Sequence, residues 1–124
     1  MGRLKNTLPL DIELVNMINA KQGFSAPLIE DPKRYVVGYK NVLQASNPSM
    51  HSKVYRLVHT ALTDAPEGAE IFGGWLADDG TYYLDYSTTH DGLTVALDIA
   101  FMRGELAIWD RLECKEIKCS NRRL

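Results

Sequence analysis

The sequence predicts an α+β domain, with a single antiparallel sheet that carries two helices on one face and an additional N-terminal helix. The clearest observation is a hairpin, in which two runs of strand-forming residues, 71–77 and 81–87, flank the turn Asp78-Asp79-Gly80. The second is an amphipathic segment after the hairpin, followed by two strand-like runs, 105–110 and 114–118. With a strand and a helix before the hairpin, the order becomes β-α-β-β-α-β, which is typical of ferredoxin-like folds.

The N-terminal half contains the remaining elements. Residues 11–21 predict a short helix, because apolar side chains recur at helical spacing behind an acidic first turn. Residues 24–33, which contain two prolines, predict a loop, and residues 35–39 predict a strand. A second helix is predicted to open at Asn47-Pro48, with asparagine as its cap, and to end before Pro66.

The third helix has the most regular pattern. Thr88 and Asp91 approximate a capping box at its start, and Gly104 is suited to its C-terminal end. From Leu93 to Phe101, apolar residues recur at helical spacing, so this face is expected to pack against the sheet. The large side chains predicted to form the core are Trp75, Leu84, Leu97, Phe101, Ile108 and Trp109.

Length and composition indicate one globular domain over residues 1–124, with 45% hydrophobic and 24% charged residues. No stretch approaches the roughly 18 uninterrupted apolar residues of a membrane span, and the N-terminus lacks the apolar segment of a secretory signal. We therefore expect a cytoplasmic protein without membrane contact. The two cysteines, Cys114 and Cys119, are expected to be reduced thiols, and no metal or other cofactor is predicted.

The distribution of charge is more informative than the net charge of −2. Residues 57–102 contain eight acidic residues and no lysine or arginine, whereas both flanking segments are rich in bases. These charges can interleave in space into a balanced surface. They can also give the molecule an acidic side, formed around the hairpin, that attracts a cationic partner.

Two histidine arrangements bear on possible chemistry. His90 beside Asp91 could act as a base with its orienting carboxylate, and a hydroxyl from residues 87–89 could be the nucleophile. A helix cap already explains the aspartate, so the sequence favours a protein that is not an enzyme. On the second helix, His51 and His59 are separated by about 12 Å along the axis, too far to share a metal ion. We interpret their face of the helix as solvated.

The pair Gly73-Gly74 lacks the spacing of a phosphate-binding loop and is interpreted as a β-bulge or a close approach of the third helix. Together with Trp75, with residues 80–87 and 104–110, and with Lys115-Glu-Ile117, it forms a set of motifs. This set, over residues 71–118, resembles a small domain of unassigned activity found in phage and mobile-element proteins. The resemblance implies a phage or prophage origin and supplies no catalytic residue.

These observations favour a phage-encoded, non-enzymatic binding module that inhibits a host factor, such as a nucleic-acid-handling defence protein. The expected partner is a host protein with a cationic surface, because an acidic hairpin disfavours nucleic acid. The alternatives are a protein that binds or sequesters a small nucleotide signal, and a virion accessory protein; homo-oligomers are compatible with each. The predicted contact residues are Asp78, Asp79, Tyr83, Asp85, Glu67 and Glu70.

Overall fold

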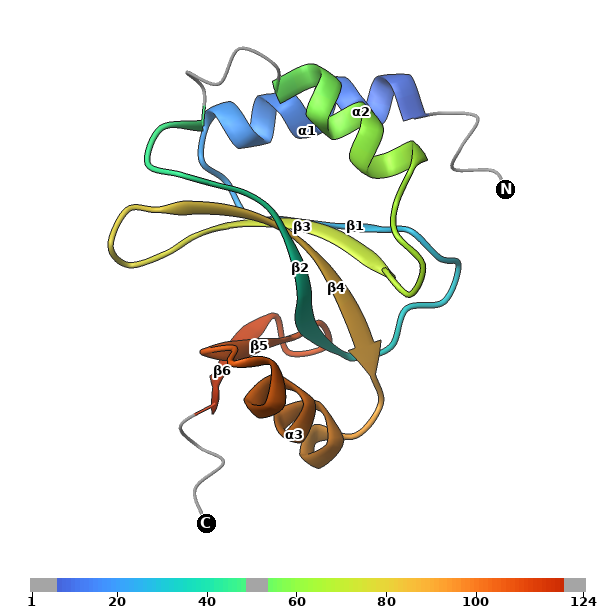
Figure 1. Cartoon of the computed structure of the whole chain (residues 1–124), viewed down its shortest axis with the longest axis vertical. Helices are drawn as coiled ribbons and strands as arrows, with labels where there is room; N and C mark the ends of the chain where they lie inside the picture. Colours follow the sequence, from blue (N-terminus) through green and yellow to red (C-terminus); the bar gives the residue numbers. More distant parts are fainter. Residues whose placement is uncertain (1–6, 49–53, 120–124) are drawn as a thin grey trace.

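The computed structural model describes residues 7–48 and 54–119 (Figure 1). The elements in these ranges are α1 (Thr7–Asn19), β1 (Phe24–Pro27), β2 (Tyr35–Ala45), α2 (Val54–Thr63), β3 (Ile71–Leu76), β4 (Tyr82–His90), α3 (Leu93–Arg103), β5 (Ala107–Asp110) and β6 (Lys115–Lys118). The predicted N-terminal helix is confirmed as α1, whereas the segment predicted as a loop before β2 contains the strand β1. None of these described helices is both long and apolar enough to cross a membrane.

All six strands belong to one antiparallel sheet, in the spatial order β1-β3-β4-β2-β5-β6. Helices α1 and α2 lie together on one side of the molecule, and α3 lies on the opposite side (Figure 1). The prediction of an α+β chain with a single antiparallel sheet is therefore confirmed. The ferredoxin-like arrangement is not confirmed, because α2 and α3 do not share one face and instead contribute to two separate cores.

Strand β2 explains why the two helices separate. It is 11 residues long, and its register with β4 shifts twice, between Gly38 and Lys40 and again between Asn41 and Leu43. Such bulges bend a strand and increase its local twist. The two ends of β2 consequently serve different cores: Val37 packs with α3, and Leu43 packs against the core of α1 and α2.

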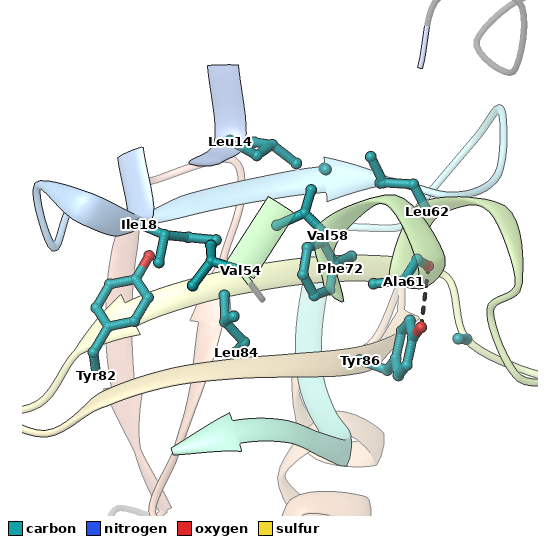
Figure 2. Packing of buried hydrophobic residues seen from close by; sticks show 12 residues of the cluster. Leu14, Ile18, Val54, Val58, Ala61, Leu62, Phe72, Tyr82, Leu84 and Tyr86 are labelled. Carbon is teal, nitrogen blue, oxygen red and sulfur yellow. Dashed lines mark hydrogen bonds between the residues drawn. The ribbon is translucent and has the colours of Figure 1, made fainter. Parts of the chain in front are cut away.

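The first core lies between the two N-terminal helices and the β3–β4 hairpin (Figure 2). Phe72, Tyr82 and Leu84 are fully buried there, because alternate residues of a strand point to the same face. The hydroxyl of Tyr82 donates to the carbonyl of Gln22 at 2.7 Å, and that of Tyr86 donates to the carbonyl of Ala61 at 3.0 Å. Both phenols therefore pack in the core without leaving a buried donor unsatisfied.

The same core explains Gly74. A Cβ atom at this position would overlap the hydroxyl of Tyr82 and would lie 2.6 Å from the ring of Phe24. Strand β3 pairs with β4 without a register shift, so the glycine does not mark a bulge. The atoms that require a glycine come from β1 and β4 rather than from the third helix. Both interpretations of Gly73-Gly74 from the sequence, a β-bulge and a close approach of the third helix, were therefore wrong.

The second core is smaller and is built around α3. Its buried residues are Tyr35, Val37, Ala96, Leu97, Ala100 and Ile108. Helix α3 approaches the sheet along its alanine stripe, which turns the neighbouring Phe101 outward, where it is 69% exposed. The core predictions are thus confirmed for three residues and wrong for three others. Those confirmed are Leu84, Leu97 and Ile108, and those exposed are Phe101, Trp75 (40%) and Trp109 (40%).

Helix α3 also begins differently from the prediction. Strand β4 continues to His90, and Gly92 is the N-cap of α3, without a side-chain hydrogen bond. The predicted capping box is wrong, because Thr88 lies in the strand, where its hydroxyl contacts His90 and Arg103. The predicted end is confirmed: Gly104 has the left-handed φ of 74° that favours glycine. For the second helix, the predicted start runs into residues 49–53, which lie outside the described ranges with His51.

An ion pair fastens β5 to the start of β2. The carboxylate of Asp110, which is buried, accepts hydrogen bonds from Nε and Nη2 of Arg34, both at 2.9 Å. It also accepts the backbone N–H groups of Leu112 and Glu113. These donors, with Arg34 the main cause, lower the pKa of Asp110 to about 2.

We expect the Arg34→Gln variant to raise the pKa of Asp110 toward its ordinary value, as followed by NMR titration of the carboxyl carbon. Because the folded pKa is depressed, the stabilisation from this carboxylate is present above the ordinary value of 3.8 and is lost as the pH falls through about 2. The difference in stability between wild type and variant should therefore vanish below that pH. Lys33→Gln, which removes the same charge one residue earlier, should leave the Asp110 titration unchanged; an equal shift would contradict the assignment.

Candidate functional site

The six predicted contact residues do not form one acidic face. Asp78 and Asp79 lie in the turn between β3 and β4, and Glu67 and Glu70 lie before β3, at the other end of the hairpin. Because consecutive strand residues advance by about 3.3 Å, the six residues of β3 separate these two groups by roughly 20 Å. Tyr83 and Asp85 lie between them on β4.

The turn carries exposed charge. Asp79 accepts the backbone N–H of Thr81 at 2.9 Å, and this hydrogen bond lowers the pKa of its carboxyl group. The charge of Asp78 contributes, after the stronger effect of Glu116, to raising the pKa of Lys118 on β6. The β3–β4 turn and the end of β6 therefore lie close enough to interact electrostatically.

Glu70 has a structural role. Its Oε1 accepts the backbone N–H of Thr89 at 2.6 Å and also the Thr89 hydroxyl, so it fastens the start of β3 to the end of β4. Glu67 is exposed, and its backbone carbonyl accepts the hydroxyl of Tyr39 at 3.3 Å. Of these two residues, Glu67 therefore presents its carboxylate to solvent, and Glu70 does not.

The strongest feature of the hairpin is on the face opposite the first core. Trp75 and Tyr83 are directly paired across β3 and β4, and their rings stack with centroids 4.8 Å apart and an interplanar angle of 16°. Asp85, two residues further along β4, accepts the indole N–H of Trp75 at 3.3 Å and the amide of Asn41 at 3.0 Å. We call Trp75, Tyr83 and Asp85 the tryptophan platform. Burial raises the pKa of Asp85, against the effect of these two hydrogen bonds.

A second carboxylate approaches the same face from the loop after α3. The carboxylate of Glu105 occupies the space that a side chain at Gly38 would fill, so any larger residue there would displace this carboxylate. Burial raises the pKa of Glu105, and the negative charge of Asp85 raises it further, whereas the charge of Arg103 lowers it. The platform therefore contains one carboxyl group, Asp85, whose charge interacts with that of a second, Glu105, and burial disfavours the anionic form of both.

The surroundings of His90 differ from the base-and-carboxylate arrangement that the sequence allowed but did not favour. The partner of its Nε2 is the hydroxyl of Thr88 at 2.9 Å, and that hydroxyl accepts a hydrogen bond from Arg103 at 2.8 Å. Burial, followed by the charge of Arg103, lowers the pKa of His90. Asp91 is exposed, and the hydrogen-bond partner of the ring is Thr88 instead.

Two further features were not predicted. His59, expected on a solvated face, lies 2.6 Å from the buried carboxylate of Asp11. The sequence did contain a signal, because Asp11 falls on the same helical stripe as the apolar Leu14 and Ile18. In the described ranges, no group of three or more His, Cys, Asp or Glu side chains is arranged to hold a metal ion.

The second feature is an open hollow of about 500 Å³ beside α3, between the start of β2 and the β5–β6 turn. It is lined by Asp31, Pro32, Lys33, Arg34, Asp91, Arg111 and Leu112. Its bases and acids nearly balance, the charge of Arg34 is already offset by Asp110, and no aromatic ring lines it. The hollow therefore lacks the stacking surface and the net positive charge that would favour a nucleotide.

The chain was compared with protein-family models, with curated proteins and with solved structures, and none of the three comparisons gave a match.

Proposed function

We propose that this chain is a non-enzymatic binding module that holds a cationic side chain of a protein partner on the tryptophan platform. The observation that carries the proposal is an indole that is 40% exposed, stacked on a tyrosine and hydrogen-bonded to a carboxylate. Tryptophan and tyrosine dominate protein interfaces because they bury large areas at little cost in conformational entropy. A rigid stacked pair is already arranged for contact before a partner arrives.

The electrostatics favour a cation. The faces of aromatic rings attract lysine and arginine side chains. Here the carboxyl group of Asp85 is hydrogen-bonded to the indole, and the carboxyl group of Glu105 is close enough to Asp85 for their charges to interact. Because burial raises the pKa of both Asp85 and Glu105, an approaching positive charge stabilises their ionised forms and gains from both. A nucleic-acid phosphate would meet the opposite field, which supports a protein partner.

The resemblance to phage and mobile-element domains supports the further proposal that the partner is a host factor, inhibited when the platform covers its cationic surface. The alternative of a nucleotide-binding protein gains little support from the hollow beside α3, for the reasons of charge and lining given above.

The proposal is tested with Trp75→Ala and Trp109→Ala, a matched pair because both indoles are 40% exposed in the wild-type chain. A tagged chain captures its partner from host lysate, and the affinity of the purified partner is then measured for each variant. We expect Trp75→Ala to weaken binding by about 2 kcal/mol or more, roughly 30-fold, and Trp109→Ala to have little effect. Equal affinities for the two variants would overturn the assignment of the platform.

The pH dependence of the same affinity provides a second prediction. Because Asp85 has a raised pKa, its carboxylate is protonated over a wider acidic range than an ordinary aspartate. A cationic partner binds the ionised form, so we expect affinity to increase as the pH rises from about 4 to 7. Asp85→Asn should weaken this dependence and leave only the part due to Glu105, whereas Asp91→Asn, which removes an exposed carboxylate elsewhere, should retain it in full. A dependence that is the same in Asp85→Asn would show that another group controls binding.

A further inference from the structure

A buried ionisable pair connects α1 to α2, on the opposite face of the hairpin from the tryptophan platform. Asp11 has no exposed surface, and a carboxylate among apolar side chains is costly unless a partner compensates its charge. The described partner is His59, whose Nδ1 lies 2.6 Å from Oδ2 of Asp11. The second oxygen, Oδ1, is buried and has no hydrogen-bond partner among the described residues. Among the described residues, the imidazole of His59 is therefore the only hydrogen-bond donor to the Asp11 carboxylate.

This contact determines how the ring is presented. A carboxylate accepts hydrogen bonds, so Nδ1 is the ring atom that carries the proton it donates. The other ring nitrogen, Nε2, has no bonded partner in the described part of the chain, and the side chain is 49% exposed. A buried carboxylate that fixes Nδ1–H while Nε2 faces outward is the arrangement in which enzymes hold a reactive histidine.

We propose that His59 is a nucleophilic histidine that accepts a phosphoryl group at Nε2 from a small acyl phosphate, with Asp11 as its positioning residue. This function is separate from binding at the tryptophan platform. In the step, the Nε2 lone pair forms a bond to phosphorus, and the bond from phosphorus to the acyl oxygen breaks. The electron pair of that bond leaves with the carboxylate product.

The local charges suit this step. The ring becomes positive as Nε2 bonds to phosphorus, and the Nδ1 proton remains hydrogen-bonded to Asp11, whose carboxylate offsets that charge. Arg56, three residues earlier on α2, is exposed and lies on the neighbouring helical turn, where a guanidinium group would attract the phosphoryl oxygens. The Thr63 hydroxyl donates to the backbone carbonyl of His59 at 2.8 Å, and among the described residues no hydroxyl or thiol is hydrogen-bonded to the His59 ring. The imidazole itself is therefore assigned as the attacking group rather than as a base for another nucleophile.

The test uses the full chain incubated with acetyl phosphate and, separately, with phosphoramidate. Phosphohistidine is followed by ³¹P NMR and assigned to a residue by peptide mass spectrometry. In the folded chain, we expect His59 to be modified at least about tenfold faster than His51 or His90, which corresponds to about 1.4 kcal/mol in barrier height. In urea, the three histidines should react at similar rates. His59→Gln should abolish the fast reaction, and His90→Gln should leave it intact.

Asp11→Asn separates positioning from a purely structural role. Asparagine keeps an acceptor for the Nδ1 proton but loses the negative charge, so the rate at His59 should fall about tenfold while circular dichroism still shows a folded chain. An unchanged rate in folded Asp11→Asn, or similar rates for all three histidines in the folded wild type, would overturn the proposal. If Asp11→Asn does not fold, the comparison among the three histidines of the wild type decides the question by itself.

Discussion

Phe72→Ala is expected to reduce the free energy of unfolding by about 3–5 kcal/mol, whereas Phe101→Ala should reduce it by less than about 1 kcal/mol. Phe72 has no exposed surface, and its ring lies 5.6 Å from that of Phe24 and 5.9 Å from that of Tyr86, centroid to centroid. Its removal would leave a cavity at the centre of the first core. Phe101 is 69% exposed, so its truncation leaves little cavity.

Urea unfolding of both variants, monitored by fluorescence and circular dichroism, measures this difference directly. The pair is informative because both changes remove the same side chain from the same protein. Similar losses for the two variants would show that α3 presents Phe101 to the sheet, as its sequence pattern had predicted, and would contradict the packing described above.

His59→Ala has the second large expected effect, a loss of about 2–3 kcal/mol in the free energy of unfolding. Removing the partner of a buried charge typically costs about 3–5 kcal/mol when the two form an ion pair, and we expect less here because the imidazole is a neutral hydrogen-bond donor and is half exposed. The loss arises because Asp11 remains buried without its described donor. The measurement is urea unfolding at neutral pH.

Two further variants separate this cause from simple loss of packing. His59→Gln retains an N–H donor for the carboxylate and should lose much less stability than His59→Ala. Adding Asp11→Leu to His59→Ala removes the stranded charge and should recover most of the loss. A double variant that is no more stable than His59→Ala would mean that the buried charge is not the source of the effect.

The parts of the fold that could be predicted from sequence are those fixed by neighbouring residues. The β3–β4 hairpin follows from strand formers around an Asp-Gly turn, and Gly104 ends α3 through its own backbone conformation. Tyr83 and Asp85 share a strand face because they are two residues apart. Each of these inferences needs only a short window of sequence.

The parts that could not be predicted depend on contacts between distant segments. The apolar pattern of α3 allows two packing faces, and the alanine stripe forms the contact only because β2 bends beneath it. Trp75 is exposed because α1 and α2 cover the other face of the hairpin, which the sequence does not specify. Strand β1 forms by pairing with the edge of β3, 47 residues further along the chain, and its own sequence is not strand-like.

The candidate site shows the same division. From the sequence, acidic residues that are close in the chain are assigned to one contact surface. In the hairpin, however, the turn with Asp78 and Asp79 and the segment before β3 lie at opposite ends. Glu70 is engaged with Thr89, and the carboxylate that does approach the platform is Glu105, 20 residues beyond Asp85. The pairing of Asp11 with His59 joins residues that are 48 positions apart on two different helices, so the only sequence signal for it was the apolar stripe that contains Asp11.

The brief junction between β2 and β5 has a consequence for local stability. The backbone ladder between these strands has only two residue pairs, Tyr35 with Asp110 and Val36 with Trp109, beside the ion pair of Arg34 with Asp110. The segment from α3 to β6 is therefore expected to detach at a lower free energy than global unfolding, as a separate unit of hydrogen exchange. Glu105 belongs to this segment and Asp85 does not, so detachment separates the two carboxyl groups. Under the proposed function, a cation bound by both carboxylates would hold this segment to the hairpin, and occupancy of the platform would suppress the opening by mass action.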